Sequence, residues 1–188
     1  GVYDFDRMTN LSVDLRGRLK KEFLILMPEI VGRQVSQEDK SVKLLLKLSD
    51  SNTVEAVYIP KDDRQTVCVS SQVGCKFHCA FCASGQNGFF RNLSSGEIIS
   101  QVLLARDESP NKKLTNIVFM GIGEPLDNTR EVLKAVRTLN SKNGLGMGAR
   151  RITISTCGVV PKIEALSDEG LQVELSVSLH GPNDRVRG

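Results

Sequence analysis

Apolar residues near the start of the chain recur at four-residue spacing, which is typical of one face of a helix. Residues 1–35 are therefore predicted to be mainly helical, with apolar positions at Leu11, Leu15, Leu19 and Phe23. A polar stretch over residues 34–40 separates this segment from a predicted β-hairpin. The arms of the hairpin are residues 41–48 and 53–60, and the turn-forming Asp50-Ser51-Asn52 joins them.

The pattern changes after residue 65, where nearly all-apolar runs alternate with helical segments. The apolar runs predict strands at residues 66–71, 114–121, 150–156 and 171–180. Helices are predicted from about residue 95, over residues 131–140 and from Pro161, and the first two have capping residues at Ser94/Glu97 and Asn128/Glu131. Strands with little polar alternation, separated by helices, indicate a parallel sheet covered by helices.

Two α/β architectures give this local pattern, an open doubly wound sheet and a (β/α) barrel. In both, functional residues gather in the loops at the carboxyl ends of the strands. The chain reaches Gly188 just after the last predicted strand, so we expect a partial TIM-like (β/α) barrel that is cut short. We expect residues 1–63 to form a helical segment plus the hairpin, at the end of an accessory region, and residues 64–188 to form the incomplete core.

Composition is that of an ordinary soluble protein. The chain has 188 residues, of which 40% are hydrophobic and 25% charged, and a formal net charge of +3, which only leans toward a polyanionic partner. No apolar run approaches the roughly 20 residues that span a bilayer, and the N-terminus has no secretion signal. We therefore expect a cytoplasmic protein. Aromatic residues make up 5% and Trp is absent, so a surface for stacking on bases is not evident.

The five cysteines favour metal or redox chemistry over a disulfide framework, because their number is odd and most of them cluster. Cys75, Cys79 and Cys82 have C-x3-C-x2-C spacing, which can bring three thiolates onto one 4Fe–4S cluster. Three ligands leave one iron open, and the amine and carboxylate of S-adenosylmethionine could chelate it. A zinc site that adds His78 is the alternative, although a His beside Cys79 suits tetrahedral closure poorly.

Residues 68–93, CVSSQVGCKFHCAFCASGQNGFFRNL, resemble the signature of the radical S-adenosylmethionine methyltransferases that modify adenine carbon-2 in 23S ribosomal RNA and transfer RNA. The resemblance covers nearly the whole chain, since YDFDRMTNLS, VEAVYIP, GIGEPL, RRITISTCGVVP and SLHGPND match family blocks in the family's order. It implies a barrel of the radical SAM type, a 4Fe–4S cluster and S-adenosylmethionine as cofactors, and RNA as the substrate. We also expect a flavodoxin-type reductase as electron donor, no membrane partner, and a monomer.

The resemblance further implies a route in which a methyl group is placed on a cysteine, a deoxyadenosyl radical takes a hydrogen from it, and the carbon radical adds to the base. A second cysteine then resolves the crosslink by forming a disulfide bond, and Cys68 matches that residue. Glu55 matches the family's proton acceptor. On the residues alone, a small buried side chain at Cys68 and a solvated carboxylate at Glu55 are favoured. The implied cofactor contacts are Gly123, Glu124, Ser155, Ser178, Leu179 and His180.

In this family the methyl-carrying cysteine lies beyond the position of Gly188, and an accessory domain usually precedes the core. We therefore expect a fragment, truncated at both ends, that binds the cluster and much of the cofactor but does not complete methyl transfer. Cys157 has no role in the family pattern, and we expect it to be a packing residue. Two alternatives stay open: a radical enzyme of another class, such as a glycyl-radical activase, and a non-enzymatic zinc or RNA-binding module.

Overall fold

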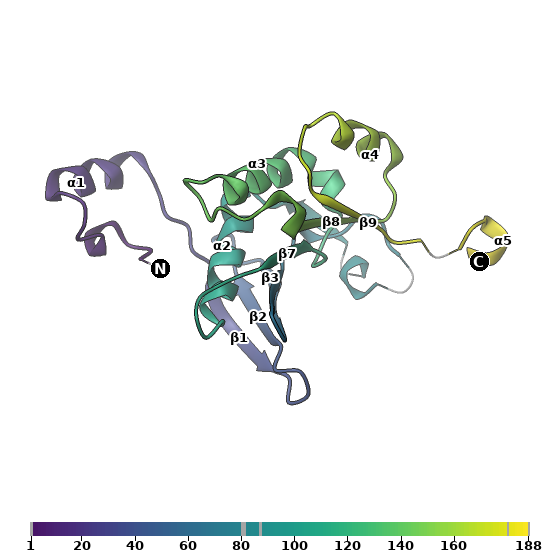
Figure 1. Ribbon diagram of the computed structural model, residues 1–188, viewed down its shortest axis with the longest axis horizontal. Coiled ribbons are helices and arrows are strands. Elements are labelled where there is room, and N and C mark those ends of the chain that lie inside the picture. Colours follow the sequence, from purple (N-terminus) through teal and green to yellow (C-terminus); the bar gives the residue numbers. More distant parts are fainter. Residues whose placement is uncertain (1, 80–81, 87, 180, 188) are drawn as a thin grey trace.

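The computed structural model describes residues 2–79, 82–86, 88–179 and 181–187. Within these residues, seven strands form one mixed sheet in the order β1-β2-β3-β4-β7-β8-β9 (Figure 1). Strands β1 to β4 pair antiparallel, and β7, β8 and β9 continue in parallel from β4. The bounds are β1 Glu29–Val35, β2 Val42–Lys47, β3 Thr53–Lys61, β4 Arg64–Cys68, β7 Asn116–Phe119, β8 Ile152–Thr156 and β9 Glu174–Val177. A separate pair, β5 Gln72–Gly74 and β6 Phe89–Asn92, flanks the cysteine loop.

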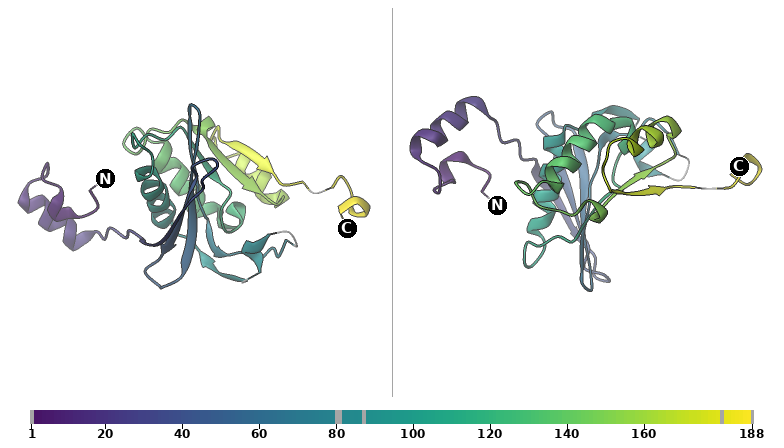
Figure 2. Two further views of the ribbon diagram at one scale, coloured as in Figure 1. Left: turned by 90° about the horizontal axis from the view of Figure 1, so that it is seen from below. Right: turned by 45° about the horizontal axis from the view of Figure 1, so that its top comes forward.

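Helices α2, α3 and α4 pack on one side of the main sheet, while α1 and α5 lie away from it toward the two ends of the chain (Figure 2). Helix α2 contacts β2, β3 and β4 and also packs against α3. The helices are α1 Val13–Glu22, α2 Ser95–Asp107, α3 Thr129–Asn140, α4 Val160–Ser167 and α5 Asp184–Arg187. Short 3-10 turns are η1 Phe5–Arg7, η2 Ala83–Gly85, η3 Pro125–Asn128 and η4 Ala149–Arg151.

Strand residues alternate between a core face and an open face. Alternate residues of β3, such as Val54 and Ala56, are fully buried on the side that α2 covers, so Glu55 points to the opposite side. Directly paired residues share a face, and Val57 pairs with Cys68, which in turn pairs with Val118. Glu55 and Cys68 therefore lie on the same face of the sheet, which we call the open face.

The predicted helix through residue 35 is wrong in its second half. Helix α1 begins after Ser12, whose side chain accepts a hydrogen bond from the backbone of Leu15, and it ends at Glu22. Residues 29–35 are strand β1, paired along their length with β2. Pro28 disfavours helical geometry at the preceding residue, and the paired sheet edge overrides the weak periodicity of this segment.

The hairpin prediction is confirmed, since β2 and β3 pair in register around the turn at residues 48–52. The sheet continues past the hairpin, because β3 extends to Lys61 and β4 starts at Arg64. The parallel arrangement is confirmed for β4, β7, β8 and β9. The division of the chain at residue 63 stays a prediction.

Candidate cofactor site

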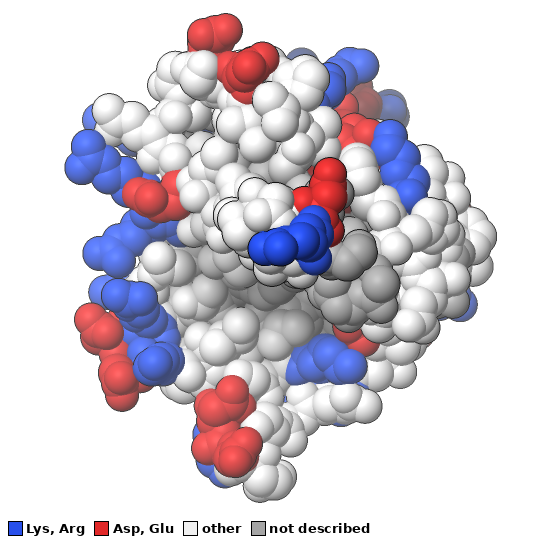
Figure 3. Space-filling model, turned by 90° about the vertical axis from the view of Figure 1, so that its right-hand side faces the viewer, with Lys and Arg blue, Asp and Glu red and all other residues white. Residues whose placement is uncertain are grey.

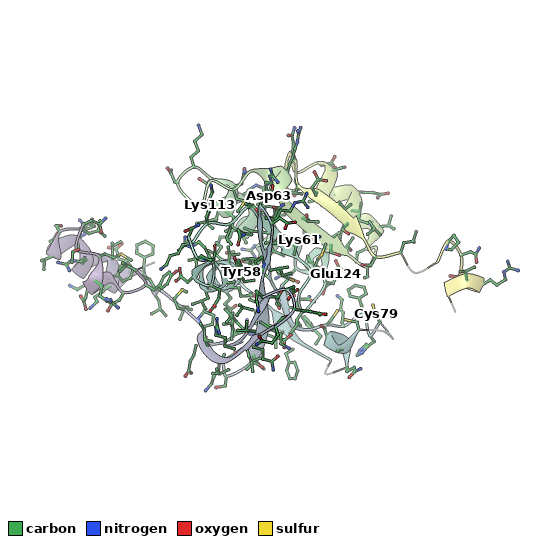
Figure 4. The ribbon with its side chains drawn as sticks, turned by 60° about the horizontal axis from the view of Figure 1, so that its bottom comes forward. Tyr58, Lys61, Asp63, Cys79, Lys113 and Glu124 are labelled. Atoms are coloured by element: carbon green, nitrogen blue, oxygen red, sulfur yellow. The ribbon has the colours of Figure 1, made fainter. Side chains whose placement is uncertain are left out.

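A cavity of about 310 Å³ lies at the carboxyl ends of β7, β8 and β9, next to the cysteine loop. It brings together segments that are far apart in the sequence. Figure 4 shows Cys79 and Glu124 on one side of the molecule, apart from Tyr58, Asp63 and Lys113, which line a different cavity. The residues that line the cofactor-side cavity are Cys75, Phe77, Cys79, Cys82, Phe119, Met120, Gly121, Gly123, Glu124, Pro125, Ser155, Thr156, Cys157 and Ser178.

The cysteine loop leaves β5 and returns through η2 to β6. The backbone N–H of Cys75 donates to the carbonyl of Gly88 at 3.0 Å, which closes the base of the loop. A turn inside the loop is held by the N–H of Cys82, which donates to the carbonyl of Cys79 at 2.9 Å. A Cβ at Gly85 would lie 3.1 Å from the Cα of His78, so the loop is closely folded on itself. These contacts hold the three thiols toward one cavity.

The Cys75 thiol is within electrostatic reach of the other two thiols and of Glu124. Partial burial raises the pKa of the Cys75 thiol, and the neighbouring Cys79, Cys82 and Glu124 raise it further. Sulfurs that hold a bound iron must be thiolates. A positive metal centre would offset this cost, because a coordinated thiol is deprotonated.

Among the described residues, no three His, Cys, Asp or Glu side chains are close enough to hold a single metal ion. A mononuclear zinc site with His78 is therefore not supported, and His78 does not line the cavity. A 4Fe–4S cluster has a different requirement, since each cysteine binds its own iron and the sulfurs stand apart. Three thiols facing one cavity fit a cluster better than they fit one ion.

Glu124 is buried, and both of its carboxylate oxygens hold backbone groups. Oε1 accepts from the N–H of Leu126 at 2.9 Å, and Oε2 accepts from the N–H of Cys157 at 2.8 Å. The carboxylate therefore ties the start of η3 to the end of β8. The Cys157 thiol also donates to this carboxylate, and the remaining acceptor capacity allows a hydrogen bond from a cationic ligand in the cavity.

Gln72 fixes the loop that carries Gly123 and Glu124. Its Oε1 accepts from the N–H of Glu124 at 2.9 Å, while Nε2 donates to Asn92 at 2.8 Å and to Asp127 at 2.9 Å. Asp127 also pairs with Lys76 of the cysteine loop. Buried, fully used amide groups of this kind rigidify their surroundings. The cysteine loop and the Gly123–Glu124 loop are thus held by one network.

Some of the remaining residues predicted to bind the cofactor line the cavity, and others do not. Ser155, on β8, and Ser178, after β9, line the cavity together with Gly123 and Glu124. Leu179 is 78% exposed and is not among the lining residues. His180 lies outside the described residues.

Glu55 and Cys68 lie outside this cavity, on the open face of the sheet. The Glu55 carboxylate is half-exposed and pairs with Lys43 of β2 at 3.0 Å. Burial raises the pKa of the Cys68 thiol to about 11. Ser70 connects Glu55 to the cofactor side, because its hydroxyl donates to the carbonyl of Glu55 at 2.7 Å and accepts from the N–H of Ile122 at 3.0 Å.

All five cysteines, each within the described residues, are free thiols. The expected disulfide bond at Cys68 is therefore not supported. Its thiol sits in a paired strand between Val57 and Val118. Cys157 also departs from expectation, since its side chain is exposed and lines the cavity rather than packing in the core. Partial burial of the thiol by the cavity wall and its hydrogen bond to Glu124 raise the pKa of Cys157 to about 12.

The sequence did not single out Phe77, Met120 or Thr156 as lining residues. Met120 and Thr156 end strands that were predicted, so their position at a carboxyl end was a usable signal. Figure 3 shows this side of the molecule, where several Lys and Arg side chains, interspersed with Asp and Glu, lie along the left margin. Among the described helices, none is long and apolar enough to cross a membrane.

Comparison with known proteins agrees with this geometry. The chain is 46% identical over 187 residues to a probable dual-specificity RNA methyltransferase RlmN of Clostridium tetani and 50% identical over 185 residues to that of Fervidobacterium nodosum. These matches cover 100% and 98% of the chain but 53% of each relative, so the chain spans about half the length of the curated relatives it matches.

A crystal structure of a radical SAM methyltransferase from Sphaerobacter thermophilus superimposes with a TM-score of 0.91 at 43% identity, covering 99% of this chain and 55% of that one. The partial TIM-like α/β fold of the radical SAM type is thus confirmed. The model of the Radical SAM superfamily matches residues 69–188, well over half of the chain. The protein therefore belongs to the radical SAM superfamily, whose cofactors are a 4Fe–4S cluster and S-adenosylmethionine.

Proposed function

We propose that this chain forms the cluster- and cofactor-binding part of a radical methyltransferase that methylates carbon-2 of adenosine in 23S ribosomal RNA and transfer RNA. One observation carries the proposal: Cys75, Cys79 and Cys82 face a single cavity together with Glu124 and with the ends of β8 and β9. The names of the matched relatives support RNA as the substrate.

In this function Cys75, Cys79 and Cys82 hold the cluster, and Glu124 accepts a hydrogen bond from the ammonium of S-adenosylmethionine. When bound, these cofactors would supply a radical that can take a hydrogen atom from a methyl group, so that the methyl carbon can add to an electron-poor ring carbon. Gly123 gives the ligand close access to the backbone, and Ser155 and Ser178 contribute hydroxyls.

Glu55 accepts the proton that carbon-2 must lose for the ring to regain aromaticity. The ion pair with Lys43 keeps this carboxylate oriented on the open face. Cys68, on the same face, is the cysteine that resolves the crosslink between the protein and the RNA.

The first test is anaerobic reconstitution of the 188-residue chain with iron and sulfide. We expect a brown chromophore with about four irons per chain, and its loss when Cys75, Cys79 and Cys82 are all replaced by Ala. Cys68→Ala removes a thiol outside the cavity and should keep the chromophore. Stoichiometric zinc in place of iron would refute the cluster.

The second test addresses the substrate. The complete reading frame that encodes this chain, reconstituted and supplied with S-adenosylmethionine and a reductant, should produce 2-methyladenosine in 23S ribosomal RNA and transfer RNA, detected by nucleoside mass spectrometry. Glu55→Gln should keep the chromophore but lose the product. Product on a protein rather than on RNA would favour a glycyl-radical activase.

We also propose that the protein works in the cytoplasm as a monomer and receives its electrons from a flavodoxin-type reductase. A reduced flavodoxin should bleach the chromophore and support turnover in place of dithionite. Sedimentation velocity should give the mass of one chain.

A further inference from the structure

A second cavity, of about 270 Å³, lies on the open face beside the cofactor cavity. The two share walls, because Gly74 and Ile122 line this cavity while their neighbours Cys75 and Gly123 line the other. Glu55 also lines this second cavity, and the full lining set is Leu45, Asn52, Thr53, Val54, Glu55, Val73, Gly74, Phe90 and Ile122. We call it the Glu55 cavity.

Phe90 is presented to this cavity by an irregular strand pair. In β5–β6, Val73 pairs with Arg91 and Gly74 pairs with Phe89, so Phe90 is the extra residue of a β-bulge. Bulges re-aim a side chain out of the regular alternation and recur next to active sites. The Phe90 side chain is 64% exposed, more than the adjacent Phe89 at 42%.

The bulge depends on a glycine opposite it. Gly74 has a φ of +74°, and a Cβ at this position would lie 1.9 Å from the carbonyl oxygen of Gly88. No other residue could keep both this conformation and this close approach. The backbone conformation opposite the bulge that presents Phe90 therefore requires a glycine.

The residues that line the Glu55 cavity indicate the chemical class of its ligand. An exposed aromatic ring favours a flat, apolar face, while the Glu55 carboxylate and the side chains of Asn52 and Thr53 favour hydrogen-bonding groups at the ligand's edge. A purely apolar ligand would leave these polar groups, with the half-exposed Glu55 carboxylate among them, without a hydrogen bond from the ligand. A nucleobase has both properties, since its faces stack and its edges hydrogen-bond.

We propose that Phe90 is the stacking platform for a purine base of the RNA substrate, held with one edge toward Glu55. This inference rests on the proposed function and adds to it the residue that seats the base. Each base stacked on an aromatic side chain contributes enough binding for Phe90→Ala to weaken RNA affinity by roughly five- to a hundred-fold. A low overall aromatic content does not exclude such a site, because one aromatic ring that a bulge directs into the cavity is sufficient for stacking.

The absence of Trp from the sequence allows a direct test. Phe90→Trp places one fluorophore in the cavity, and titration with a single-stranded oligouridylate that contains one adenosine should quench it. The matched control is Phe23→Trp, at a site outside the cavity whose side chain is 59% exposed. It should not be quenched by the same RNA. Equal quenching of the two proteins would overturn the proposal.

Conservative variants separate stacking from general hydrophobic contact. Phe90→Tyr should bind the oligonucleotide like the unaltered chain, while Phe90→Leu should bind as weakly as Phe90→Ala. Wild-type affinity in Phe90→Leu would also overturn the proposal. Circular dichroism checks that each variant is folded.

These measurements use the chain without its cluster, so they are independent of methyl transfer. If the complete reading frame yields 2-methyladenosine but Phe90→Trp is not quenched, this inference alone fails. If Phe90→Trp is quenched but 2-methyladenosine is not formed, base binding stands and the proposed function fails.

Discussion

Gly123 occupies a position that no other residue fits without rearrangement. Its φ is +100°, and a Cβ there would lie 2.5 Å from the Cβ of Gln72 and 2.8 Å from its backbone nitrogen. Any substitution therefore strains the backbone and pushes against the residue that orients Glu124.

Gly123→Ala should destabilise the chain more than Gly146→Ala does. Gly146 has a φ of +62° but open space around it, so its variant carries only the backbone cost, roughly 1–3 kcal/mol. Urea unfolding measures both variants. Equilibrium dialysis of the reconstituted proteins should show weaker S-adenosylmethionine binding for Gly123→Ala only, and equal behaviour of the two variants would contradict this account.

Cys68 should resist alkylation at neutral pH, because burial raises its pKa to about 11 from an ordinary value of 9.0. Iodoacetamide labelling followed by mass spectrometry should show slow reaction at pH 8 and a steep rise toward pH 11. The unfolded chain in urea provides the reference rate, and an equal rate in the folded chain at pH 8 would refute the prediction.

The same shift has a consequence for stability. A raised thiol pKa means that the folded chain binds the proton more tightly than the unfolded chain does between pH 9 and 11. The stability that Cys68 contributes as a neutral thiol is complete below pH 9 and is lost as the pH rises through 11. The free energies of unfolding of the unaltered chain and of Cys68→Ala, measured by urea titration, should therefore converge or cross in that window.

Sequence reasoning identified residues whose chemistry depends on spacing. Cys75, Cys79 and Cys82 were found in this way, and they face one cavity. Phe90 was not found, because its exposure results from a bulge at which Gly74 pairs with Phe89. Strand pairing across a loop cannot be predicted from local periodicity. Cys157 was assigned to packing because the family pattern has no role for it, whereas its side chain is exposed and lines the cavity.

At the scale of elements, the start of α2 illustrates what local sequence can specify. Ser94 and Glu97 form a capping box: the Glu97 N–H donates to the Ser94 hydroxyl at 3.3 Å, and Glu97 Oε2 accepts from the Ser94 N–H at 2.9 Å. The carboxylate of Glu97 also binds Arg91, which reaches on to Asp50 in the β2–β3 turn. The cap therefore joins α2, β6 and the hairpin.

Ser94→Ala should lower the free energy of unfolding by about 1 kcal/mol, as expected for loss of an N-cap. Ser49→Ala, at an exposed position in the β2–β3 turn, should change it by less than about 0.5 kcal/mol. Urea titration followed by circular dichroism gives both values. A change in Ser94→Ala no larger than that of Ser49→Ala would show that Arg91 and Asp50 hold the helix start without the cap.

The ends of other elements could not be predicted from the local sequence. The start of α3 was predicted to be capped by the Asn128 side chain, and that is wrong, because this amide instead donates to the carbonyls of Ser71 and Leu93 at 2.8 Å. The expected partner Glu131 accepts from the N–H of Ser95, at the start of α2. Both side chains serve contacts between elements, which depend on the assembled fold.

At the scale of the molecule, the alternation of strands and helices was enough to predict the parallel half of the sheet. It was not enough to predict how the hairpin joins that half. Strand β4 pairs antiparallel with β3 and parallel with β7, so the sheet is continuous across residues 61–64. Such a junction depends on long-range pairing, and the charged turn before β4 gives no indication of it.

This junction at β4 also sets an order of folding. Pairing of β1 to β4 closes only short loops. Pairing of β4 with β7 instead closes a long loop, which contains the whole segment from Cys68 to Asn116. Closing longer loops costs more chain entropy and slows folding. Pulsed hydrogen exchange during refolding should therefore protect the amides of β2 and β3 before those of β8 and β9, and simultaneous protection would contradict this order. The strands that carry Glu55 and Cys68 would then be in place before β8 and β9 complete the wall of the cofactor cavity.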